Sequence, residues 1–255
     1  METVMDDSVS AGQQADSRQD WRERTGLLVG KDGLDRLACA SVTVVGTGGV
    51  GAFAAEMIAR AGVGKMVLID SDTVSVTNKN RQLLALDSTV GRPKCEVLAE
   101  RLKDINPDIV LTVRNEYLDA GNVAGTLGNE RPDFVVDAID TVAPKLALIE
   151  YCIKNNIPMV SSMGAGAKMD VTRIRIADIS KTFNCPLAFV VRKRLRRMGI
   201  RKGLKTVFSE ELPDRNAFVA CDEQNKKSNA GTISYMPAVF GCACAQVALE
   251  TLLGL

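Results

Sequence analysis

The sequence contains no histidine among its 255 residues. Histidine is the commonest general base near neutral pH and the commonest metal-binding side chain. Its absence excludes hydrolases that depend on a serine–histidine or cysteine–histidine pair. The chemistry of this chain must therefore use Asp, Lys, Arg, Cys or groups on the substrate itself.

Paired cysteines are missing as well. The seven cysteines include no C-x-x-C pair, the spacing that commonly holds structural zinc, so no zinc is expected. An odd number of cysteines without the spacing of a disulfide scaffold is typical of reduced thiols and indicates a cytoplasmic protein. Cys242 and Cys244 are spaced C-x-C in an apolar, helix-like segment. Helical spacing would point the two side chains apart. The apolar context predicts that both are core cysteines.

The sequence also lacks long apolar runs and an excess of charge. Its apolar runs are interrupted before the roughly 20 residues that a membrane span needs, so no membrane association is expected. The acidic N-terminus has no apolar segment of the kind found in secretory signals. The formal net charge of +1 indicates no class of partner. Residues 1–20, rich in Ser, Gln, Asp and Ala, are predicted to be a disordered tail.

A glycine-rich turn is the most informative feature that is present. Residues 42–45 are predicted to be a buried strand, and residues 52–61 follow as an apolar helix. In this context G-x-G-x-x-G predicts a nucleotide-binding loop, because glycine allows close approach to a phosphate and the helix N-terminus favours negative charge. The glycines of the turn are Gly46, Gly48, Gly49 and Gly51.

An acid follows the next apolar run. Residues 66–69 are predicted to be a strand, and they end in Asp70, nineteen residues after Gly51. A carboxylate in this position suits a ribose hydroxyl. Asp72 is assigned to the ribose and the adjoining loop, with a simple turn cap as the alternative. A tight turn without a ligand would explain the glycines but not Asp70.

Strands and helices alternate along the following residues, which predicts a parallel sheet built from βαβ units. Ligands of such sheets bind beyond the carboxyl ends of the strands, so the glycine turn, Asp70 and Asp140 should meet at one edge. Expected strands cover residues 109–113, 133–139 and 157–161, and expected helices cover residues 33–40, 91–105, 119–127 and 145–155.

The pattern changes in the C-terminal half. Residues 171–176 alternate as a half-exposed strand does, and residues 204–208 are expected to pair with them. Residues 237–253 are apolar and predicted to be helical. The predicted fold class is α/β, a Rossmann-like, mostly parallel sheet flanked by helices and extended by antiparallel strands in the C-terminal half. Residues 21–255 are predicted to be a single domain.

Five short patterns occur in order along the chain: G-x-G-G-x-G, D-x-D, N-x-x-R-Q, V-G-x-P-K and D-x-x-D. Together they resemble the nucleotide site of the ubiquitin-activating-enzyme superfamily, whose members adenylate carboxylates. The resemblance covers nearly the whole chain after Trp21, and it implies that ATP is the nucleotide and that this domain is an adenylating one. Beyond the glycine turn, the matching residues are Asp70, Asp72, Asn78, Arg81, Gln82, Lys94 and Asp140.

The charge of a triphosphate supports the same interpretation. A glycine turn can largely neutralise the diphosphate of a nicotinamide dinucleotide, whereas adenylation must also stabilise departing pyrophosphate and requires cations aimed at the phosphates. Arg81 and Lys94 supply such cations, and one helical turn would place Asn78 on the same face as Arg81. Asp140 can hold Mg2+ through its oxygens. The alternatives are a surface charge for Arg81 and an ordinary helix lysine for Lys94, whose charge is unfavourable at a helix N-terminus.

The resemblance also implies a second subunit. Similar enzymes carry an N-terminal arginine that reaches the ATP phosphates of the neighbouring subunit, and Arg24 occupies the matching position. A homodimer is therefore expected, with a solvated helix arginine as the alternative for Arg24.

Within the superfamily, the sequence is most similar to the branch of tRNA threonylcarbamoyladenosine dehydratases. These enzymes use ATP to cyclise the threonylcarbamoyl group on the adenosine beside the anticodon, so tRNA carrying threonylcarbamoyladenosine is the implied substrate. Ring closure is intramolecular, which suits a protein without histidine. The segments that carry the similarity are residues 161–166, 177–182, 185–187 and 231–237.

Some members of this branch carry a cysteine shortly before the C-terminal glycine-rich stretch, linked to sulfur-relay partners. The corresponding residues 225–229 contain no cysteine, and Cys221 is the nearest. Cys185, which precedes a proline, is the remaining candidate for a functional thiol, with a structural cysteine as the alternative. A sulfur-relay partner stays an expectation from the resemblance.

A basic run lies in the C-terminal half, with no acid before Glu210. Phosphate backbones bind such runs with release of counterions, so the run predicts a tRNA-binding surface; a solvated helix face is the alternative. Aromatic residues are poorly interleaved with the run, so base stacking is not indicated there. The residues assigned to tRNA are Arg192, Lys193, Arg194, Arg196 and Arg197.

Three other functions stay open on the sequence alone. The first is an adenylyltransferase that activates the C-terminus of a ubiquitin-like sulfur carrier; the basic run and the missing zinc pairs count against it. A nicotinamide-dependent oxidoreductase is disfavoured by Asn78, Arg81 and Lys94. A non-catalytic nucleotide-binding module is disfavoured by the same phosphate-directed cations.

Overall fold

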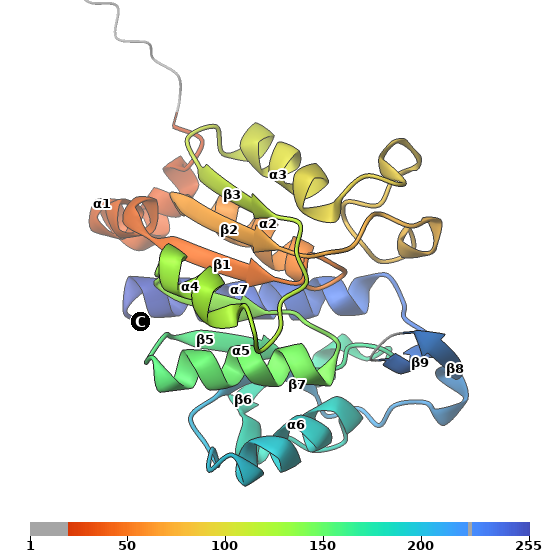
Figure 1. Cartoon of the computed structure of the whole chain (residues 1–255). Coiled ribbons are helices and arrows are strands. Elements are labelled where there is room, and N and C mark those ends of the chain that lie inside the picture. The colour runs from red at the N-terminus through yellow and green to blue at the C-terminus, as the bar shows by residue number, and fades with distance from the viewer. Residues whose placement is uncertain (1–19, 224–225) are drawn as a thin grey trace, which may run out of the picture.

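The computed structural model describes residues 20–223 and 226–255, without the side chains of residues 220–229. The predicted tail, residues 1–20, lies outside this range except for Asp20. Seven strands form the central sheet (Figure 1): β1 (Ser41–Val45), β2 (Lys65–Ile69), β3 (Val110–Arg114), β4 (Phe134–Asp137), β5 (Met159–Ser162), β6 (Ile174–Asp178) and β7 (Lys205–Ser209).

The strand order is β3-β2-β1-β4-β5-β7-β6. Neighbouring strands are parallel from β3 to β7, and β6 pairs antiparallel with β7. The α/β, mostly parallel sheet predicted from the sequence is thereby confirmed. The pairing of the alternating segment with residues 204–208 is also confirmed. The extension contributes one antiparallel strand to the sheet, since β7 continues the parallel direction of β5.

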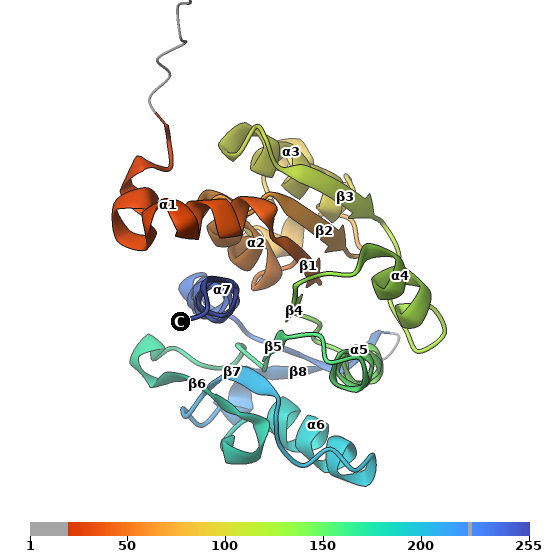
Figure 2. The ribbon, with the colours of Figure 1, turned by 90° about the vertical axis from the view of Figure 1, so that its left-hand side faces the viewer.

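Helices cover both faces of the sheet, which explains why its central strands are apolar throughout. On one face the core contains residues of α1 (Glu23–Cys39), α2 (Gly51–Arg60), α3 (Lys94–Ile105) and α7 (Tyr235–Leu253). On the other face it contains residues of α4 (Val123–Glu130), α5 (Val142–Lys154) and α6 (Pro186–Arg197) (Figure 2). A separate hairpin of β8 (Phe218–Glu223) and β9 (Lys226–Ala230) lies beside the start of α7 (Figure 1).

The first helix is longer than predicted. The sequence predicts a helix over residues 33–40, whereas α1 begins at Glu23 and runs to Cys39. Gly30 has a positive φ of 72° inside it, so two helical segments meet at a kink there. The kink explains the error. The residues before and after Gly30 show two different sequence patterns, and the fold joins them into one kinked helix.

The helix α7 corrects the expectation about apolar runs. By length and composition alone its 19 residues could cross a membrane, contrary to the prediction that every apolar run is too short. Its residues Met236, Phe240, Cys244 and Ala248 are buried in the core shared with α2. Packing inside the protein therefore accounts for the apolar character of α7.

Candidate active site

The glycine turn lies at the carboxyl edge of the sheet, between β1 and α2. Gly46 has a φ of +86°, and a Cβ atom there would lie 2.8 Å from the carbonyl oxygen of Ala138. A Cβ atom at Gly51 would lie 1.7 Å from the carbonyl oxygen of Gly46. The first N–H groups of a helix have no acceptor within it. The Ala52 nitrogen donates to the Gly48 carbonyl oxygen at 3.2 Å, and the other donors at this helix start form a cradle suited to a phosphate.

Asp70, at the end of β2, fixes this turn. Its Oδ2 accepts hydrogen bonds from the backbone nitrogen of Thr47 at 2.6 Å and from Thr47 Oγ1 at 3.1 Å. Its Oδ1 accepts one from the backbone nitrogen of Asp72 at 2.9 Å. A carboxylate has about four acceptor positions, so Asp70 can hold Thr47 and still accept from a ribose hydroxyl.

Lys94 and Asp72 form an ion pair beside Asp70. Lys94 begins α3 directly after Pro93, three residues later than the predicted start, and its Nζ lies 2.7 Å from Asp72 Oδ2. The Lys94 side chain is buried, whereas that of Asp72 is exposed. A buried ammonium whose carboxylate partner faces solvent can exchange that partner for a phosphate oxygen.

The segment from Asn78 to Gln82 packs on the glycine turn. Gly49 has room only for a hydrogen, because a Cβ atom would lie 3.0 Å from Pro237 and 3.3 Å from the Arg81 carbonyl oxygen. The amide of Gln82 faces Gly48, and its buried Oε1 has no hydrogen-bond partner among the described residues. An orphaned buried acceptor beside a phosphate cradle fits a site completed by a bound ligand.

The guanidinium of Arg81 is held by neutral groups. Its Nη1 donates to the Thr77 carbonyl oxygen at 3.0 Å and to Asn80 Oδ1 at 2.9 Å, and no described carboxylate pairs with it. The predicted turn between Asn78 and Arg81 is present, since the Arg81 nitrogen donates to the Asn78 carbonyl oxygen at 3.0 Å. The half-exposed positive charge of Arg81 therefore stays available to an anion.

A buried ion pair supports the end of β4. Lys145 Nζ lies 2.7 Å from Asp137 Oδ2, and Ser161 Oγ donates to the same oxygen at 2.6 Å. Asp137 Oδ1 accepts from the backbone nitrogen of Ile139 at 3.0 Å, which holds the turn at Ala138 against the glycines. The sequence analysis missed Lys145 and Ser161, which lie 8 and 24 residues from Asp137 along the chain and share no motif with it.

Asp140 is exposed at the same carboxyl edge, three residues beyond Asp137. Among the described residues, no group of three or more His, Cys, Asp or Glu side chains is placed to hold a metal ion. Asp140 alone can offer one carboxylate to Mg2+, and nucleotide-bound magnesium usually takes its remaining ligands from phosphate oxygens and waters.

Arg24 lies far from the cradle of its own chain. It is exposed on α1, two residues after Arg22, whose side chain packs against Gly62 just before β2. In Figure 1 the start of α1 lies toward the amino ends of the parallel strands, away from the end of β1 where the glycine turn begins. The structure thus brings together the other predicted nucleotide residues but leaves Arg24 on the far side.

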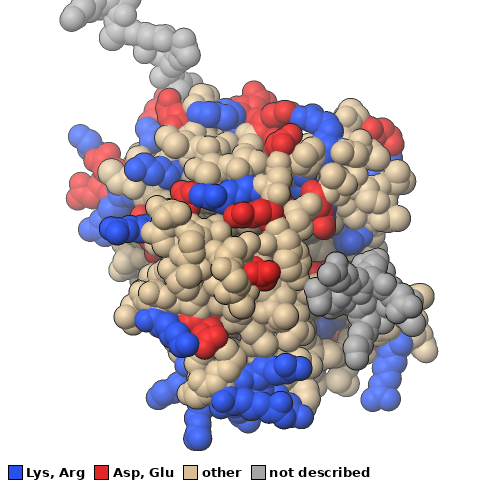
Figure 3. All heavy atoms as spheres, in the orientation of Figure 1, with Lys and Arg blue, Asp and Glu red and all other residues tan. Residues whose placement is uncertain are grey.

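The basic run lies on α6 at the lower end of the molecule in Figure 3, where blue side chains gather without red ones. Lys193, Arg194, Arg196 and Arg197 are exposed, and none forms an ion pair with a described carboxylate. Arg192 differs, because its guanidinium donates to the carbonyl oxygen and hydroxyl of Thr182 at 2.6 and 2.5 Å. Four of the five residues assigned to tRNA therefore form an open cationic surface, which we call the basic face.

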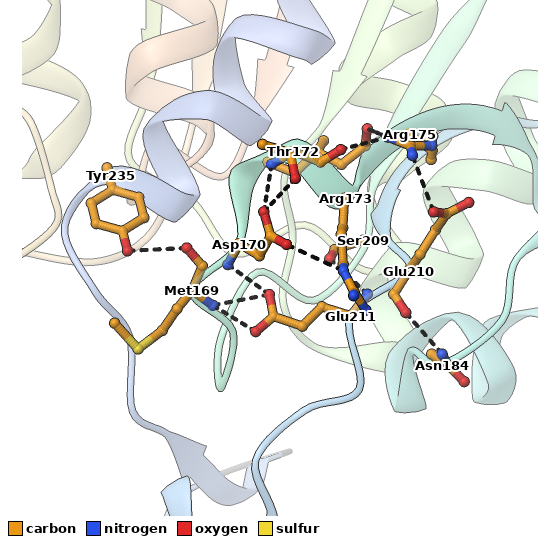
Figure 4. Close-up of polar contacts among 11 residues, drawn as sticks. Met169, Asp170, Thr172, Arg173, Arg175, Asn184, Ser209, Glu210, Glu211 and Tyr235 are labelled. Atoms are coloured by element: carbon orange, nitrogen blue, oxygen red, sulfur yellow. Dashed lines mark hydrogen bonds and ion pairs between the residues drawn. The ribbon is translucent and has the colours of Figure 1, made fainter.

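A hydrogen-bond network closes the other end of the carboxyl edge (Figure 4). The carboxylate of Glu211, after β7, accepts from the backbone nitrogens of Met169 and Asp170 at 3.0 and 2.8 Å. The Tyr235 hydroxyl donates to the Met169 carbonyl oxygen at 3.0 Å. These contacts fix the loop after β5 against the start of α7. No sequence pattern signals them, because the partners are separated by 41 to 66 residues.

The structure describes the side chains of every cysteine except Cys221. Cys242 is exposed and Cys244 buried, so the prediction that they point apart is confirmed, but the expectation that both are core cysteines is wrong for Cys242. Burial raises the pKa of Cys244. Cys185 is buried at the start of α6, facing Gly164. Cys221 lies in β8, and its side chain is outside the described residues.

Comparison with known proteins adds a family to this geometry. The model of the ThiF family matches residues 23–255. The chain is 44% identical over 227 residues to the tRNA threonylcarbamoyladenosine dehydratase of Bacillus subtilis, covering 86% of this chain and 89% of that protein. It is 41% identical over 254 residues to the enzyme of the same description from Escherichia coli, covering 91% and 94%.

Solved structures agree with the sequence relatives. The E. coli tRNA N6-threonylcarbamoyladenosine dehydratase in complex with ATP superposes with a TM-score of 0.84 at 39% identity, covering 92% of this chain and 96% of that one. The molybdopterin-synthase adenylyltransferase of E. coli is a more distant relative, 36% identical over 154 residues, which cover 60% of this chain and 61% of that protein.

Proposed function

This chain belongs to the ThiF family, and on that premise we propose that it is an ATP-dependent tRNA threonylcarbamoyladenosine dehydratase, a cyclase of the ligase class acting in the cytoplasm. The observation that carries the proposal is the phosphate cradle of the glycine turn with two cations, Arg81 and Lys94, beside it. Identity of 41–44% over most of the chain to proteins of that description supports the same substrate.

The first step is the adenylation of a carboxylate. An oxygen of the threonylcarbamoyl carboxylate forms a bond to the α-phosphorus of ATP, and pyrophosphate leaves with the electrons of the broken P–O bond. Negative charge grows on the leaving group, where preorganised cations stabilise it most effectively. Arg81 can pair with the phosphate oxygens through two N–H groups. Lys94 can release Asp72 and donate its ammonium protons to a phosphate oxygen instead.

The second step is ring closure on the acyl-adenylate. The carbamoyl group attacks the activated acyl carbon and releases one N–H proton to solvent, the acyl–oxygen bond breaks, and AMP leaves with the former carboxylate oxygen. Both reacting groups belong to one substituent, so proximity supplies much of the rate. No histidine is required for such a step, which agrees with the composition of the chain.

Asp140 would hold Mg2+ at this edge, with the nucleotide phosphates supplying the other ligands; bound magnesium would neutralise phosphate charge. We expect Asp140→Asn to raise the magnesium concentration needed for half-maximal adenylation by about tenfold, since metal affinity commonly falls by 10- to 100-fold when a supporting carboxylate is lost. A magnesium titration of pyrophosphate release measures the shift. An unaltered titration would remove Asp140 from the metal site.

A homodimer would complete the site with Arg24. The α1 helix exposes two adjacent leucines near it, Leu27 at 83% and Leu28 at 87% of their surface, and exposed apolar patches of this kind often mark interfaces. The position of Arg24 at the amino edge excludes contact with its own cradle. In a homodimer, Arg24 would therefore contact the phosphates bound at the cradle of the partner subunit.

Mixing two inactive variants tests this arrangement. If Arg24 acts across the interface, Arg24→Ala mixed with an equal amount of Arg81→Ala forms heterodimers with one intact site each. After subunit exchange, about one quarter of wild-type activity should return. Activity that stays at the level of the separate variants would place Arg24 outside the neighbouring site.

Pyrophosphate release tests the function as a whole. Release should depend on tRNA carrying threonylcarbamoyladenosine, and AMP should appear with the cyclised tRNA. Release that depends instead on a ubiquitin-like sulfur carrier would establish the adenylyltransferase alternative. Tighter calorimetric binding of NAD than of ATP would contradict both.

A further inference from the structure

Two exposed aromatic rings lie beside the basic face, although the sequence analysis predicts no base stacking there. Phe183 precedes α6 and exposes 48% of its surface, and Phe189 lies on α6 and exposes 56%. Phe189 stands three residues before the basic run and Phe183 nine, but that both rings are exposed beside it becomes visible only in the fold. Aromatic rings left open to solvent beside free cations form a surface with two kinds of binding group.

Both rings are held in place from behind. Phe183 packs edge-to-face on the buried Phe208, with ring centroids 5.6 Å apart and planes at 72°. The guanidinium of Arg192 lies over the ring of Phe189, 6.0 Å from its centroid, and is itself fixed by two hydrogen bonds to Thr182. Rings with such support lose little freedom when another ring stacks on them.

Phe189 and the cations of the basic face follow one another along the exposed side of α6. Residues three and four apart lie on one side of a helix, so Phe189, Lys193, Arg196 and Arg197 share a stripe. Ala188, Val191 and Leu195 form the buried side. The helix contains no acid. The stripe thus begins with an aromatic ring and continues with cations alone.

The aromatic end of the stripe lies nearer to the nucleotide site. Asn184 Nδ2 donates to the carbonyl oxygen of Glu210, just beyond the end of β7 (Figure 4), so the start of α6 is at the carboxyl edge. The strand order puts three strand spacings between β7 and β1, where the glycine turn begins. Three strand spacings separate the carboxyl ends of β7 and β1 by about 14 Å, which is the length of a few nucleotides.

We propose that Phe183 and Phe189 form a stacking platform for unpaired bases of the tRNA anticodon loop, beside the adenosine that reacts. The proposal rests on the tRNA function proposed above and adds the part of the RNA that each surface contacts. Single-stranded bases stack on aromatic side chains with little regard to sequence. The phosphates of the adjoining stem then meet the basic face further along α6.

Variants that remove the rings but keep apolar packing test the platform. Phe183→Leu and Phe189→Leu should each weaken binding of an anticodon stem-loop RNA by at least about fivefold. Binding of a fully paired RNA hairpin of equal length should not change, because it offers no unpaired base. Phe189→Tyr keeps a ring and should bind as the wild type does. Thermal unfolding and ATP affinity report on the fold of each variant.

Trp21→Leu is the matched control. Trp21 is also exposed and has an arginine, Arg22, 5.9 Å from its ring centroid, but it lies on α1's side of the sheet. Equal affinity of wild type and both leucine variants for the stem-loop would overturn the platform. Equal weakening for the paired hairpin would overturn it as well. Failure of the wild type to bind any tRNA would instead contradict the proposed function.

Discussion

Replacing Arg81 by alanine is expected to slow tRNA-dependent pyrophosphate release by about 10²–10³-fold at saturating ATP, the usual cost of losing one group that stabilises transition-state charge. Among the described residues, the guanidinium donates to the neutral oxygens of Thr77 and Asn80 and pairs with no carboxylate, so its full charge can act on the phosphates. As the bond to the α phosphorus breaks, the β and γ phosphates gain negative charge relative to the same phosphates in bound ATP. The loss should therefore fall mainly on the rate and less on ATP affinity.

Lys94→Ala should have a similar effect for a different structural reason. The Lys94 ammonium is buried against Asp72, and its removal leaves that carboxylate to repel the incoming phosphates. Lys79→Ala is the matched control, since Lys79 lies in the same region but pairs with the exposed Asp87 at 2.6 Å. Unchanged turnover in either Arg81→Ala or Lys94→Ala would remove that residue from the catalytic site. A similar loss in Lys79→Ala would point to a nonspecific effect of charge.

The architecture was predictable because its signals are local. Apolar runs such as residues 42–45 and 66–69 encode buried parallel strands, and the glycines after the first run can only be a tight turn at a strand end. Once strands and helices alternate, the carboxyl ends of the strands share one edge. That topology alone predicts that the glycine turn, Asp70 and Asp140 lie at the same edge, before any side-chain contact between them is known.

The supporting contacts were not predictable because they join residues far apart in the chain. Ser161 donates to Asp137 across 24 residues, and Thr47 binds Asp70 across 23. The exposure of Phe189 depends on how α6 packs, since an apolar residue in a helix is buried or exposed according to its face. The apolar α7 shows the converse, because sequence alone cannot distinguish a core helix from a membrane span of the same length.

Reversal of two charges on the basic face should weaken tRNA binding by about 10²-fold at physiological salt. Arg194 and Arg197 are exposed on α6 and form no ion pair with a described carboxylate. Replacing both by Glu removes two phosphate contacts and adds repulsion. ATP affinity should not change, because the start of α6, not its basic end, lies at the carboxyl edge.

The salt dependence separates a phosphate contact from a change in fold. Each contact contributes about −0.7 to −0.9 to the slope of log affinity against log salt, so the double variant should show a slope shallower by about 1.5. Lys65→Glu with Lys103→Glu makes the same change in net charge at other exposed sites and should leave the slope unaltered. Equal slopes in the wild type and the α6 variant would mean that the basic face is only solvated. In that case the stacking platform would also lose the adjoining phosphate contacts that orient the RNA on α6.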